Sequence, residues 1–164
     1  MIRMAVLYHS KSGNTRQMAQ AIADGMETVE GVEAKIFSIH RFDPDFVAES
    51  RCVVLGTPTY LASMSGEMKA FLDGNARKAG LAGKLGGAFA TADYLHGGAD
   101  LAIQGILSHL MVLGMLVYSG GGACGKPVIH LGPVALKDGL EEAAPVFRLY
   151  GQRMAAKAAE LFGK

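Results

Sequence analysis

One stretch near the N-terminus is dense in groups that can bind an anion. The stretch is His9-Ser10-Lys11-Ser12-Gly13-Asn14-Thr15, which follows an apolar run and opens a helical pattern. The first N–H groups of a helix are unpaired and carry partial positive charge, so an anion is expected there. Gly13 lets the backbone curl around a phosphate, and four side chains can add donors: Ser10, Ser12, Asn14 and Thr15. The stretch predicts a phosphate site, although the same residue types suit an ordinary helix N-cap.

Two later loops each combine an aromatic residue with stiff or small residues. The first, Thr57–Gly66, is expected to expose Tyr60 and Met64, and its candidate ligand contacts are Pro58, Thr59, Tyr60 and Leu61. The second contributes Thr91, Ala92, Asp93, Tyr94, His96, Gly97 and Gly98. A tyrosine offers a flat face to a planar ring, and small residues let a ligand edge approach the backbone. The alternative interpretations, without a ligand, are that Tyr60 only covers the end of the sheet and that His96 is a solvated loop histidine.

Alternating apolar runs and helical patterns must position these loops. Three runs are apolar on both faces, as in interior strands of a parallel sheet: Ile2–Tyr8, Arg51–Gly56 and Leu85–Thr91. Val32–Ser38 is expected at one edge, and Gly114–Tyr118, continued by Pro127–Leu131, at the other. The helices are predicted over Thr15–Val29, Glu67–Arg77, Asp100–Leu113 and within Leu140–Phe162.

These units predict an α/β fold in which helices cover both faces of a five-stranded parallel sheet of order 2-1-3-4-5, the flavodoxin-like three-layer sandwich. Ligands of such sheets bind beyond the carboxyl ends of the strands, where the strand order reverses. The three loops are therefore expected to meet at one edge and to bind a ligand with a phosphate tail and a flat polar ring. Flavin mononucleotide, FMN, has that shape. The stretch His9–Thr15 contains neither the GxxxxGKS/T nor the GxGxxG pattern, so the nucleoside-triphosphate and dinucleotide fingerprints fail there.

Several segments resemble a known group. Ser10–Thr15 resembles the phosphate loop of flavodoxin-fold FMN proteins, and Gly56–Tyr60, running on through Met64 to Asp73, is similar to a segment of WrbA-type NAD(P)H:quinone oxidoreductases and their NADPH-dependent FMN-reductase relatives. His96–Gly98 falls at their glycine-rich ring-binding loop, and Arg148–Ala155 resembles their terminal helix. The resemblance extends over nearly the whole chain.

The resemblance implies a role for each loop. Ser10–Thr15 would hold the phosphate, Pro58–Leu61 would line one side of the isoalloxazine ring, and Thr91–Gly98 would line the other. Tyr94 departs from the small residues of the quinone reductases and resembles the ring-stacking loop of flavodoxins. The flavin itself would carry the chemistry, with Tyr94 and His96 as the candidate catalytic residues.

Composition and charge narrow the class of protein. Half of the 164 residues are hydrophobic and the net charge is +1, which excludes a disordered chain and gives no footprint for nucleic acid or an anionic membrane. One domain is expected over residues 1–164. The long apolar stretch Leu101–Tyr118 contains Gln104, Ser108 and His109, so a buried helix and strand are predicted rather than a membrane span.

Other residues that can do chemistry are given structural interpretations. Cys52 and Cys124 are far apart and form neither a disulfide framework nor a CxxC pattern, so no metal site is predicted and the cytoplasm is the expected location. Cys52 is expected to be a buried hydrophobe, and Cys124 to lie in a mobile glycine-rich flap over residues 119–126. His109 is expected to be an interior histidine.

Three functions remain open from the sequence. An electron carrier keeps its flavin among acidic residues and docks onto basic partners, whereas these loops are close to neutral. This favours a reductase that takes electrons from NADH or NADPH and reduces a quinone or another small acceptor, over a flavodoxin-type carrier. A cofactor-free signalling domain is disfavoured, because Thr57 and His9-Ser10 stand where a phospho-receiver needs acids. Excess apolar residues over Leu101–Leu113 suggest a homodimer or homotetramer.

Overall fold

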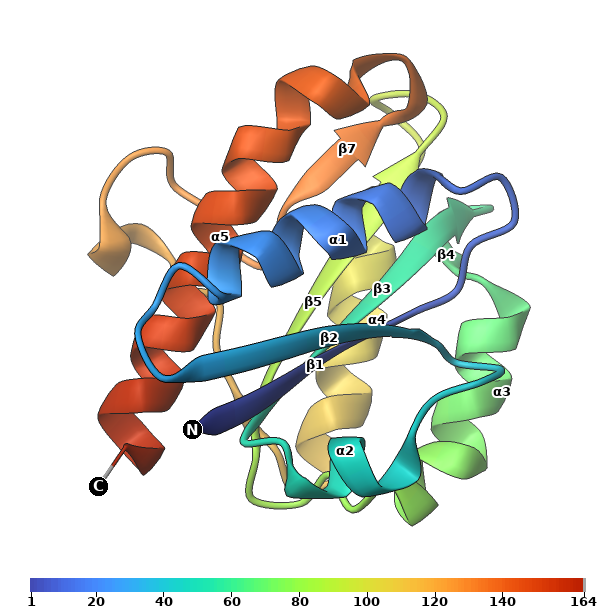
Figure 1. The fold of residues 1–164 in the computed structure, drawn as a ribbon. Coiled ribbons are helices and arrows are strands. Elements are labelled where there is room, and N and C mark those ends of the chain that lie inside the picture. The colour runs from blue at the N-terminus through green and yellow to red at the C-terminus, as the bar shows by residue number, and fades with distance from the viewer. Residues whose placement is uncertain (164) are drawn as a thin grey trace.

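The computed structural model describes residues 1–163 and has three layers, a twisted sheet between two layers of helices (Figure 1). The strands are β1 Ile2–Tyr8, β2 Val32–Ser38, β3 Cys52–Tyr60, β4 Ser63–Met64, β5 Leu85–Ala92, β6 Leu116–Val117 and β7 Val134–Leu136. The helices are α1 Asn14–Met26, α2 Pro44–Glu49, α3 Gly66–Asp73, α4 Ala99–Val112 and α5 Leu140–Phe162. Lys164, the last residue of the predicted domain 1–164, lies outside the described residues, and the single-domain organisation stays a prediction.

The sheet confirms the predicted strand order. Its path is β2-β1-β3-β5-β6, which is 2-1-3-4-5 once the short β4 is set aside, and every pair along this path is parallel. Val54, for example, lies between Val6 of β1 and Gly87 of β5. The interior strands β1, β3 and β5 are buried along most of their length, as their uninterrupted apolar runs predict.

The far edge of the sheet differs from the prediction. The fifth strand is only Leu116–Val117, beside the start of β5, and the continuation predicted at Pro127–Leu131 is wrong. The chain instead leaves the sheet and returns as β7, which pairs with the end of β5. Between these strands, Arg153 of α5 donates hydrogen bonds to the carbonyl oxygens of Cys124 and Pro127, at 3.0 and 2.9 Å. The segment predicted as a mobile flap is therefore tied to α5.

The two helical layers cover opposite faces of the sheet. α1 and α5 pack on one face, around Met18, Ile22 and Phe147, while α2, α3 and α4 pack on the other (Figure 1). The sequence interpretation had no helix at Pro44–Glu49, because six residues are too few to show a helical period. A cap does mark it: the Asp43 carboxylate accepts hydrogen bonds from the N–H groups of Asp45 and Phe46, the second and third residues of the helix, and Pro44 begins it.

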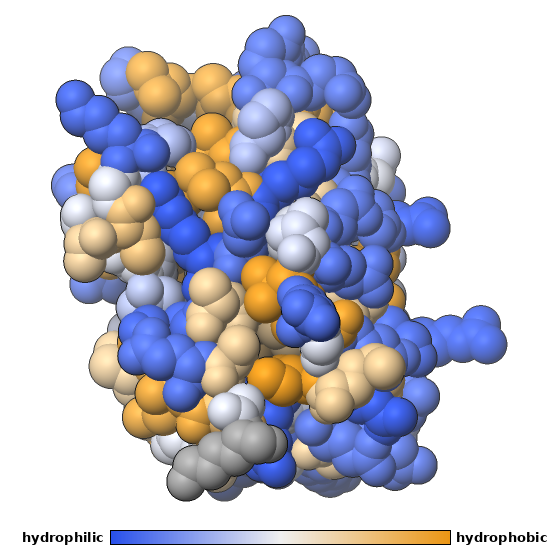
Figure 2. Space-filling view, turned by 60° about the vertical axis from the view of Figure 1, so that its left-hand side comes forward, coloured by the Kyte–Doolittle hydropathy of each residue, from blue (hydrophilic) through white to orange (hydrophobic). Residues whose placement is uncertain are grey.

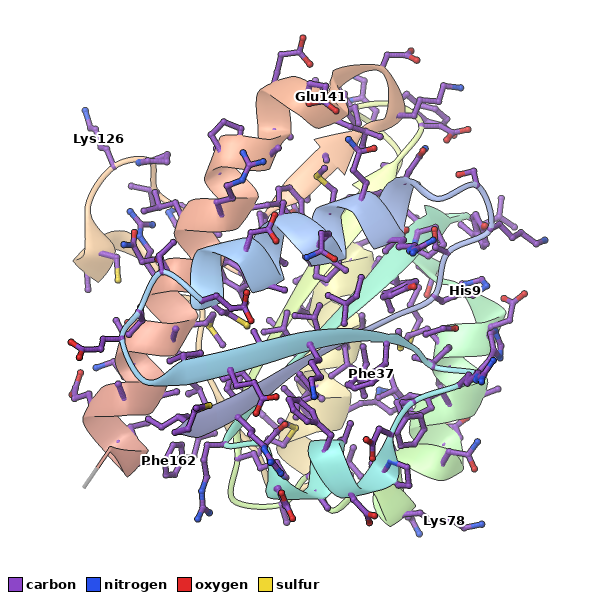
Figure 3. The ribbon with its side chains drawn as sticks, viewed as in Figure 1. His9, Phe37, Lys78, Lys126, Glu141 and Phe162 are labelled. Carbon is purple, nitrogen blue, oxygen red and sulfur yellow. The ribbon has the colours of Figure 1, made fainter. Side chains whose placement is uncertain are left out.

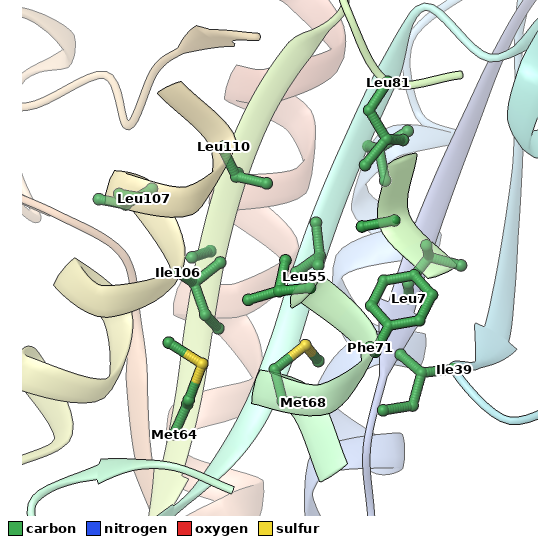
Figure 4. Close-up of a cluster of buried hydrophobic side chains, with 14 of the residues drawn as sticks. Leu7, Ile39, Leu55, Met64, Met68, Phe71, Leu81, Ile106, Leu107 and Leu110 are labelled. Atoms are coloured by element: carbon green, nitrogen blue, oxygen red, sulfur yellow. The ribbon is translucent and has the colours of Figure 1, made fainter. Parts of the chain in front are cut away.

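The face covered by α3 and α4 contains one continuous apolar cluster (Figure 4). Leu7 and Leu55 of the sheet meet Met68 and Ile106 of the two helices, and all four side chains are fully buried. Burying each such side chain contributes about 1.5–3 kcal/mol. Met64 belongs to the same cluster and is 8% exposed, so its predicted exposure is wrong. A tight turn folds β4 back onto β3, and this turns Met64 inward.

Cys52, Cys124 and His109, which were predicted to have structural roles, are buried to different degrees. Cys52 is fully buried, as predicted, and burial raises the pKa of its thiol. Cys124 is half-buried, with its sulfur 3.4 Å from the Tyr118 hydroxyl. His109 is half-buried rather than interior, because it lies on the α4 face next to α3. Its Nδ1 is 3.0 Å from the Gly105 carbonyl oxygen, and its Nε2 is 3.5 Å from the Asp73 carboxylate.

The stretch Leu101–Tyr118 forms most of α4 and then β6, as predicted. None of the helices in residues 1–163 is long and apolar enough to cross a membrane. On the face that carries α5 and the segment between β6 and β7, hydrophilic residues are interspersed with smaller hydrophobic groups (Figure 2).

Candidate ligand-binding site

A pocket of about 280 Å³ opens at the carboxyl ends of β3 and β5, beside the N-terminus of α1. This is the edge at which the strand order reverses and at which ligands of open α/β sheets bind. All three predicted loops line it. Its lining residues are Lys11, Ser12, Asn14, Thr15, Pro58, Thr59, Tyr60, Leu61, Thr91, Ala92, Asp93, Tyr94 and Gly97.

The loop between β1 and α1 presents the start of a helix to the pocket. Gly13 precedes α1 with a φ of 98°, a left-handed conformation that favours glycine, and its N–H donates to Ser10 Oγ at 3.1 Å. α1 has no side-chain cap hydrogen bond and no acidic residue in its first turn. Its N-terminal N–H groups and partial positive charge are thus not neutralised from within the helix, and an anion in the pocket would be stabilised there.

The loop after β3 is a tight hairpin. β3 and β4 pair antiparallel, with Tyr60 opposite Ser63, and the two residues between them, Leu61 and Ala62, have φ values of 49° and 60°. Both are non-glycine residues in the left-handed region, which costs about 1–2 kcal/mol each. Leu61 is fully exposed at the tip. The hairpin therefore holds an apolar tip beside the pocket at an energetic cost.

Thr59, in the same hairpin, carries a polar group that lacks a partner. Its hydroxyl oxygen is buried and makes no hydrogen bond within residues 1–163, although Thr59 lines the pocket. An unpaired buried hydroxyl costs about 1–3 kcal/mol. A polar ligand edge in the pocket would remove this cost.

The loop after β5 completes the pocket. Tyr94 is 66% exposed and lines the pocket together with Tyr60, which is 40% exposed, so two aromatic rings border one opening. The Asp93 carboxylate lies 3.7 Å from Lys137 Nζ. The two loops also touch each other, because a Cβ at Gly98 would lie only 2.5 Å from Ala62 Cβ.

A buried hydrogen-bond network joins the first loop to the second. His9 is 4% exposed at the end of β1, beside α3, and its Nδ1 lies 2.8 Å from Ser65 Oγ (Figure 3). Ser65 caps α3 by accepting from the Met68 N–H. The His9 Nε2 atom is 3.8 Å from the Glu67 carboxylate. Burial lowers the pKa of His9, and Glu67 opposes that shift, so His9 is neutral near pH 7.

A second buried contact joins the first loop to the third. The hydroxyl oxygens of Thr15 and Thr91 lie 2.8 Å apart, and the two residues are only 1% and 4% exposed. Thr15 is in the first turn of α1 and Thr91 is near the end of β5, so this hydrogen bond closes the floor of the pocket.

Most of the predicted site residues come together. Twelve of the sixteen candidates line the pocket; Ser10, Gly13, His96 and Gly98 do not. Ser10 and Gly13 shape the loop before α1, and Gly98 precedes α4 and packs against Ala62. His96 is exposed on the third loop. Lys11 lines the pocket but was not among the candidates, although its place between Ser10 and Ser12 was a signal for it.

The doubly wound sheet, with an uncapped helix N-terminus and two aromatic loops at its switch point, defines a flavodoxin-like protein. The sequence model of a family described as "NADPH-dependent FMN reductase" matches residues 2–125. The chain belongs to this family. The family resemblance inferred from the loop motifs is therefore confirmed.

Individual relatives agree with this assignment. The chain is 42% identical to "Flavodoxin" of Clostridium saccharobutylicum over 161 residues, which are 98% of this chain and 100% of that protein. It is 28% identical to "NAD(P)H dehydrogenase (quinone)" of Chromohalobacter salexigens over 202 residues, 99% of this chain and 100% of that protein. A solved structure of a WrbA-like flavodoxin from Agrobacterium tumefaciens is 25% identical, with a TM-score of 0.75, over 98% of this chain and 99% of that one.

Proposed function

We propose that the pocket binds one FMN and that the protein is an oxidoreductase that takes two electrons from NADH or NADPH and passes them to a quinone-like small molecule. The observation that carries this proposal is the presence, in one pocket, of the uncapped N-terminus of α1 and two exposed tyrosine rings. An anion suits the first feature and a flat conjugated ring suits the second, and FMN has both. The family and its quinone-dehydrogenase relative support the reaction class.

The residues at the first loop fit a phosphate. Ser12, Asn14 and Thr15 would donate from their side chains, together with the first N–H groups of α1. The ammonium group of Lys11 would balance part of the phosphate charge. Ser10 and Gly13 would act by holding the loop in shape.

The residues of the other two loops fit a flat ring with polar edges. Pro58, Thr59, Tyr60 and Leu61 would lie on one side of it, and the third loop, with Ala92, Asp93, Tyr94 and Gly97, on the other. The buried hydroxyl of Thr59 would gain a partner in a heteroatom of the ring edge. Tyr94 and His96 are the candidate catalytic residues, with Tyr94 lining the pocket and His96 on the exposed part of the same loop.

When bound, FMN would supply two-electron hydride chemistry. The chain would orient the ring and set the charge around it. The charged residues that line the pocket are Lys11 and Asp93, and Asp93 faces Lys137 at 3.7 Å, so the surroundings are not negative. One-electron carriers surround their flavin with acids, because negative charge disfavours the reduced anionic ring. The charge balance therefore favours a reductase.

A flavodoxin-type electron carrier is the second candidate. It is favoured by one specific observation, the 42% identity to a protein named "Flavodoxin". The two candidates differ in their reaction with nicotinamide cofactors, because a carrier needs a partner protein to reduce it whereas a reductase accepts the hydride directly.

Anaerobic stopped-flow mixing separates these candidates. The FMN-loaded protein is mixed with NADH or NADPH, and the absorbance of the oxidised flavin is followed. The reductase proposal expects bleaching within seconds, and multiple turnovers once menadione is added. Free FMN at the same concentration is the control for non-enzymatic reduction. A bound flavin that stays oxidised for minutes with both nucleotides contradicts the reductase and leaves the carrier.

Two further proposals concern the cellular location of the protein and its oligomeric state. We expect a cytoplasmic protein, because Cys52 and Cys124 are free thiols.

We also expect a homodimer or homotetramer, because Leu101, Met111 and Val112 are 59%, 59% and 82% exposed on α4. Sedimentation at micromolar concentration tests the assembly, and a monomer would contradict it.

A further inference from the structure

The hydrogen bond between Thr15 and Thr91 carries an inference about the phosphate half of the site, and this inference rests on the proposed binding of FMN. The resemblance to quinone reductases groups Thr91 with the residues that line the ring. In the structure, however, the Thr91 hydroxyl contacts Thr15, in the first turn of α1, at 2.8 Å. Its contact is therefore with the phosphate loop.

The two threonine hydroxyl groups carry one proton more than their mutual hydrogen bond uses. Each threonine hydroxyl has one proton to donate and can accept two hydrogen bonds. One proton is used between the two oxygens, and within residues 1–163 neither hydroxyl makes any other hydrogen bond. One proton is therefore left over, in a place where both side chains are almost completely buried and line the pocket. A buried donor needs an acceptor, and an anion in the pocket would be one.

The position of the two residues indicates which of them keeps the free proton. Thr15 is in the first turn of α1, where the N–H groups of an uncapped helix end attract an acceptor. Thr91 is in β5 between two neighbouring strands, opposite Pro58 and Ala135. A bond donated by Thr91 to Thr15 leaves the Thr15 proton free on the side of the helix N-terminus.

We propose that Thr91 is a positioning residue for the phosphate: its hydroxyl donates to Thr15 Oγ1 and thereby holds the Thr15 proton toward the phosphate group. Without Thr91, the Thr15 hydroxyl rotates freely and can turn its lone pair toward the anion. Thr91 thus acts on affinity for the phosphate through Thr15, without contact with the ring.

The test compares FMN with riboflavin, which has the same ring but no phosphate. Both are titrated into the Thr91→Val variant, which keeps the branched shape and removes the hydroxyl. The ratio of the riboflavin dissociation constant to the FMN dissociation constant should fall about tenfold, because a hydrogen bond to a charged group is weakened. Thr91→Ser keeps the hydroxyl and should restore the ratio to within about twofold.

A double variant tests the route through Thr15. Thr15→Val should lower the ratio at least as much as Thr91→Val, and adding Thr91→Val to Thr15→Val should lower it no further. Thr59→Val is the matched control, because it removes a buried hydroxyl from the ring side of the same pocket. It should weaken the binding of both flavins similarly and leave the ratio unchanged.

The outcomes distinguish this inference from the proposed function. If the unaltered protein binds neither flavin, the proposed function fails. If it binds both, and Thr91→Val leaves the ratio unchanged or weakens both flavins equally, Thr91 is only structural and the inference is overturned. Should Thr91→Val fail to fold, Thr91→Ala carries the same test, because it also lacks the hydroxyl and its riboflavin binding reports a folded pocket.

Discussion

The contact between the two ring-side loops predicts the effect of one added methyl group at Gly98. Gly98 has a φ of 84°, and a Cβ there would lie 2.5 Å from Ala62 Cβ and 2.7 Å from Ala62 Cα. Carbon atoms in contact prefer about 3.5–4.0 Å, so the hairpin tip must retreat by about 1 Å. Tyr60 and Leu61 belong to that tip and line the pocket. Gly98→Ala should therefore open the ring side of the site.

The cost of Gly98→Ala divides into two parts. The left-handed backbone costs about 1–2 kcal/mol once a Cβ is present, and the overpacking against Ala62 adds about 1–3 kcal/mol. Gly83 offers a matched control, because its φ is 76° and a Cβ there would meet no atom within 4 Å. Gly83→Ala should pay only the backbone part.

Urea unfolding and flavin titration measure the two variants. Gly98→Ala should lose about 2–5 kcal/mol of unfolding free energy, against about 1–2 kcal/mol for Gly83→Ala. Gly98→Ala should also bind both FMN and riboflavin about tenfold more weakly, since a misplaced hairpin loses contact with the ring they share. Gly83→Ala should bind both normally. Equal stability and equal affinity in the two variants would refute the reasoning, because the contact with Ala62 would then have no effect.

Two other perturbations have expected outcomes. Lys84 is 7% exposed, and its Nζ donates to the carbonyl oxygens of Val47, Ala48 and Ser50 at 3.1, 2.5 and 2.6 Å. Lys84→Met removes these hydrogen bonds and should lower the free energy of unfolding, measured in urea, by about 2–3 kcal/mol. A change within experimental error would show that these hydrogen bonds do not stabilise the fold. Because the pKa of His9 is lowered in the folded protein, the unfolded chain takes up a proton before the folded protein does as the pH falls below about 6.5. The contribution of His9 to the free energy of unfolding is therefore fully present above that pH and declines below it. His9→Gln should flatten that decline between about pH 7 and pH 5, and an unchanged slope would show that other groups cause it.

The sequence predicted the order of the sheet because its interior strands are long and apolar on both faces. β1, β3 and β5 bury side chains toward both helical layers, and that pattern is local and easily recognised. The three loops could then be brought together from topology alone. Twelve of the sixteen candidate residues line one pocket for that reason.

The parts that could not be predicted depend on contacts between distant segments or on short elements. β7 has three residues, too few for a period, and it forms because β5 offers an unpaired edge beyond β6. The turn at Leu61 and Ala62 contains no glycine or asparagine, so the usual signal for a hairpin is missing. The burial of Met64 follows from that turn and was missed with it.

The hydrogen bonds of the site could not be predicted from the sequence either. Thr15 and Thr91 are each ordinary residues in their own loops, and only the fold brings their hydroxyls to 2.8 Å. The sequence places His9 in the first loop, yet its ring is buried against Ser65 of the second. Side-chain pairing across loops requires coordinates, because each partner is more than fifty residues from the other.

The central claim is that FMN binds in this pocket with its phosphate at the N-terminus of α1. Fluorescence titration of FMN into the purified, flavin-free protein and its Ser12→Ala variant tests it most directly. We predict quenching that saturates at one FMN per chain, weaker binding of riboflavin, and a loss of FMN affinity in the variant of about tenfold, with little change for riboflavin. No saturable quenching by the unaltered protein, or equal affinity for the two flavins in both proteins, would contradict the account.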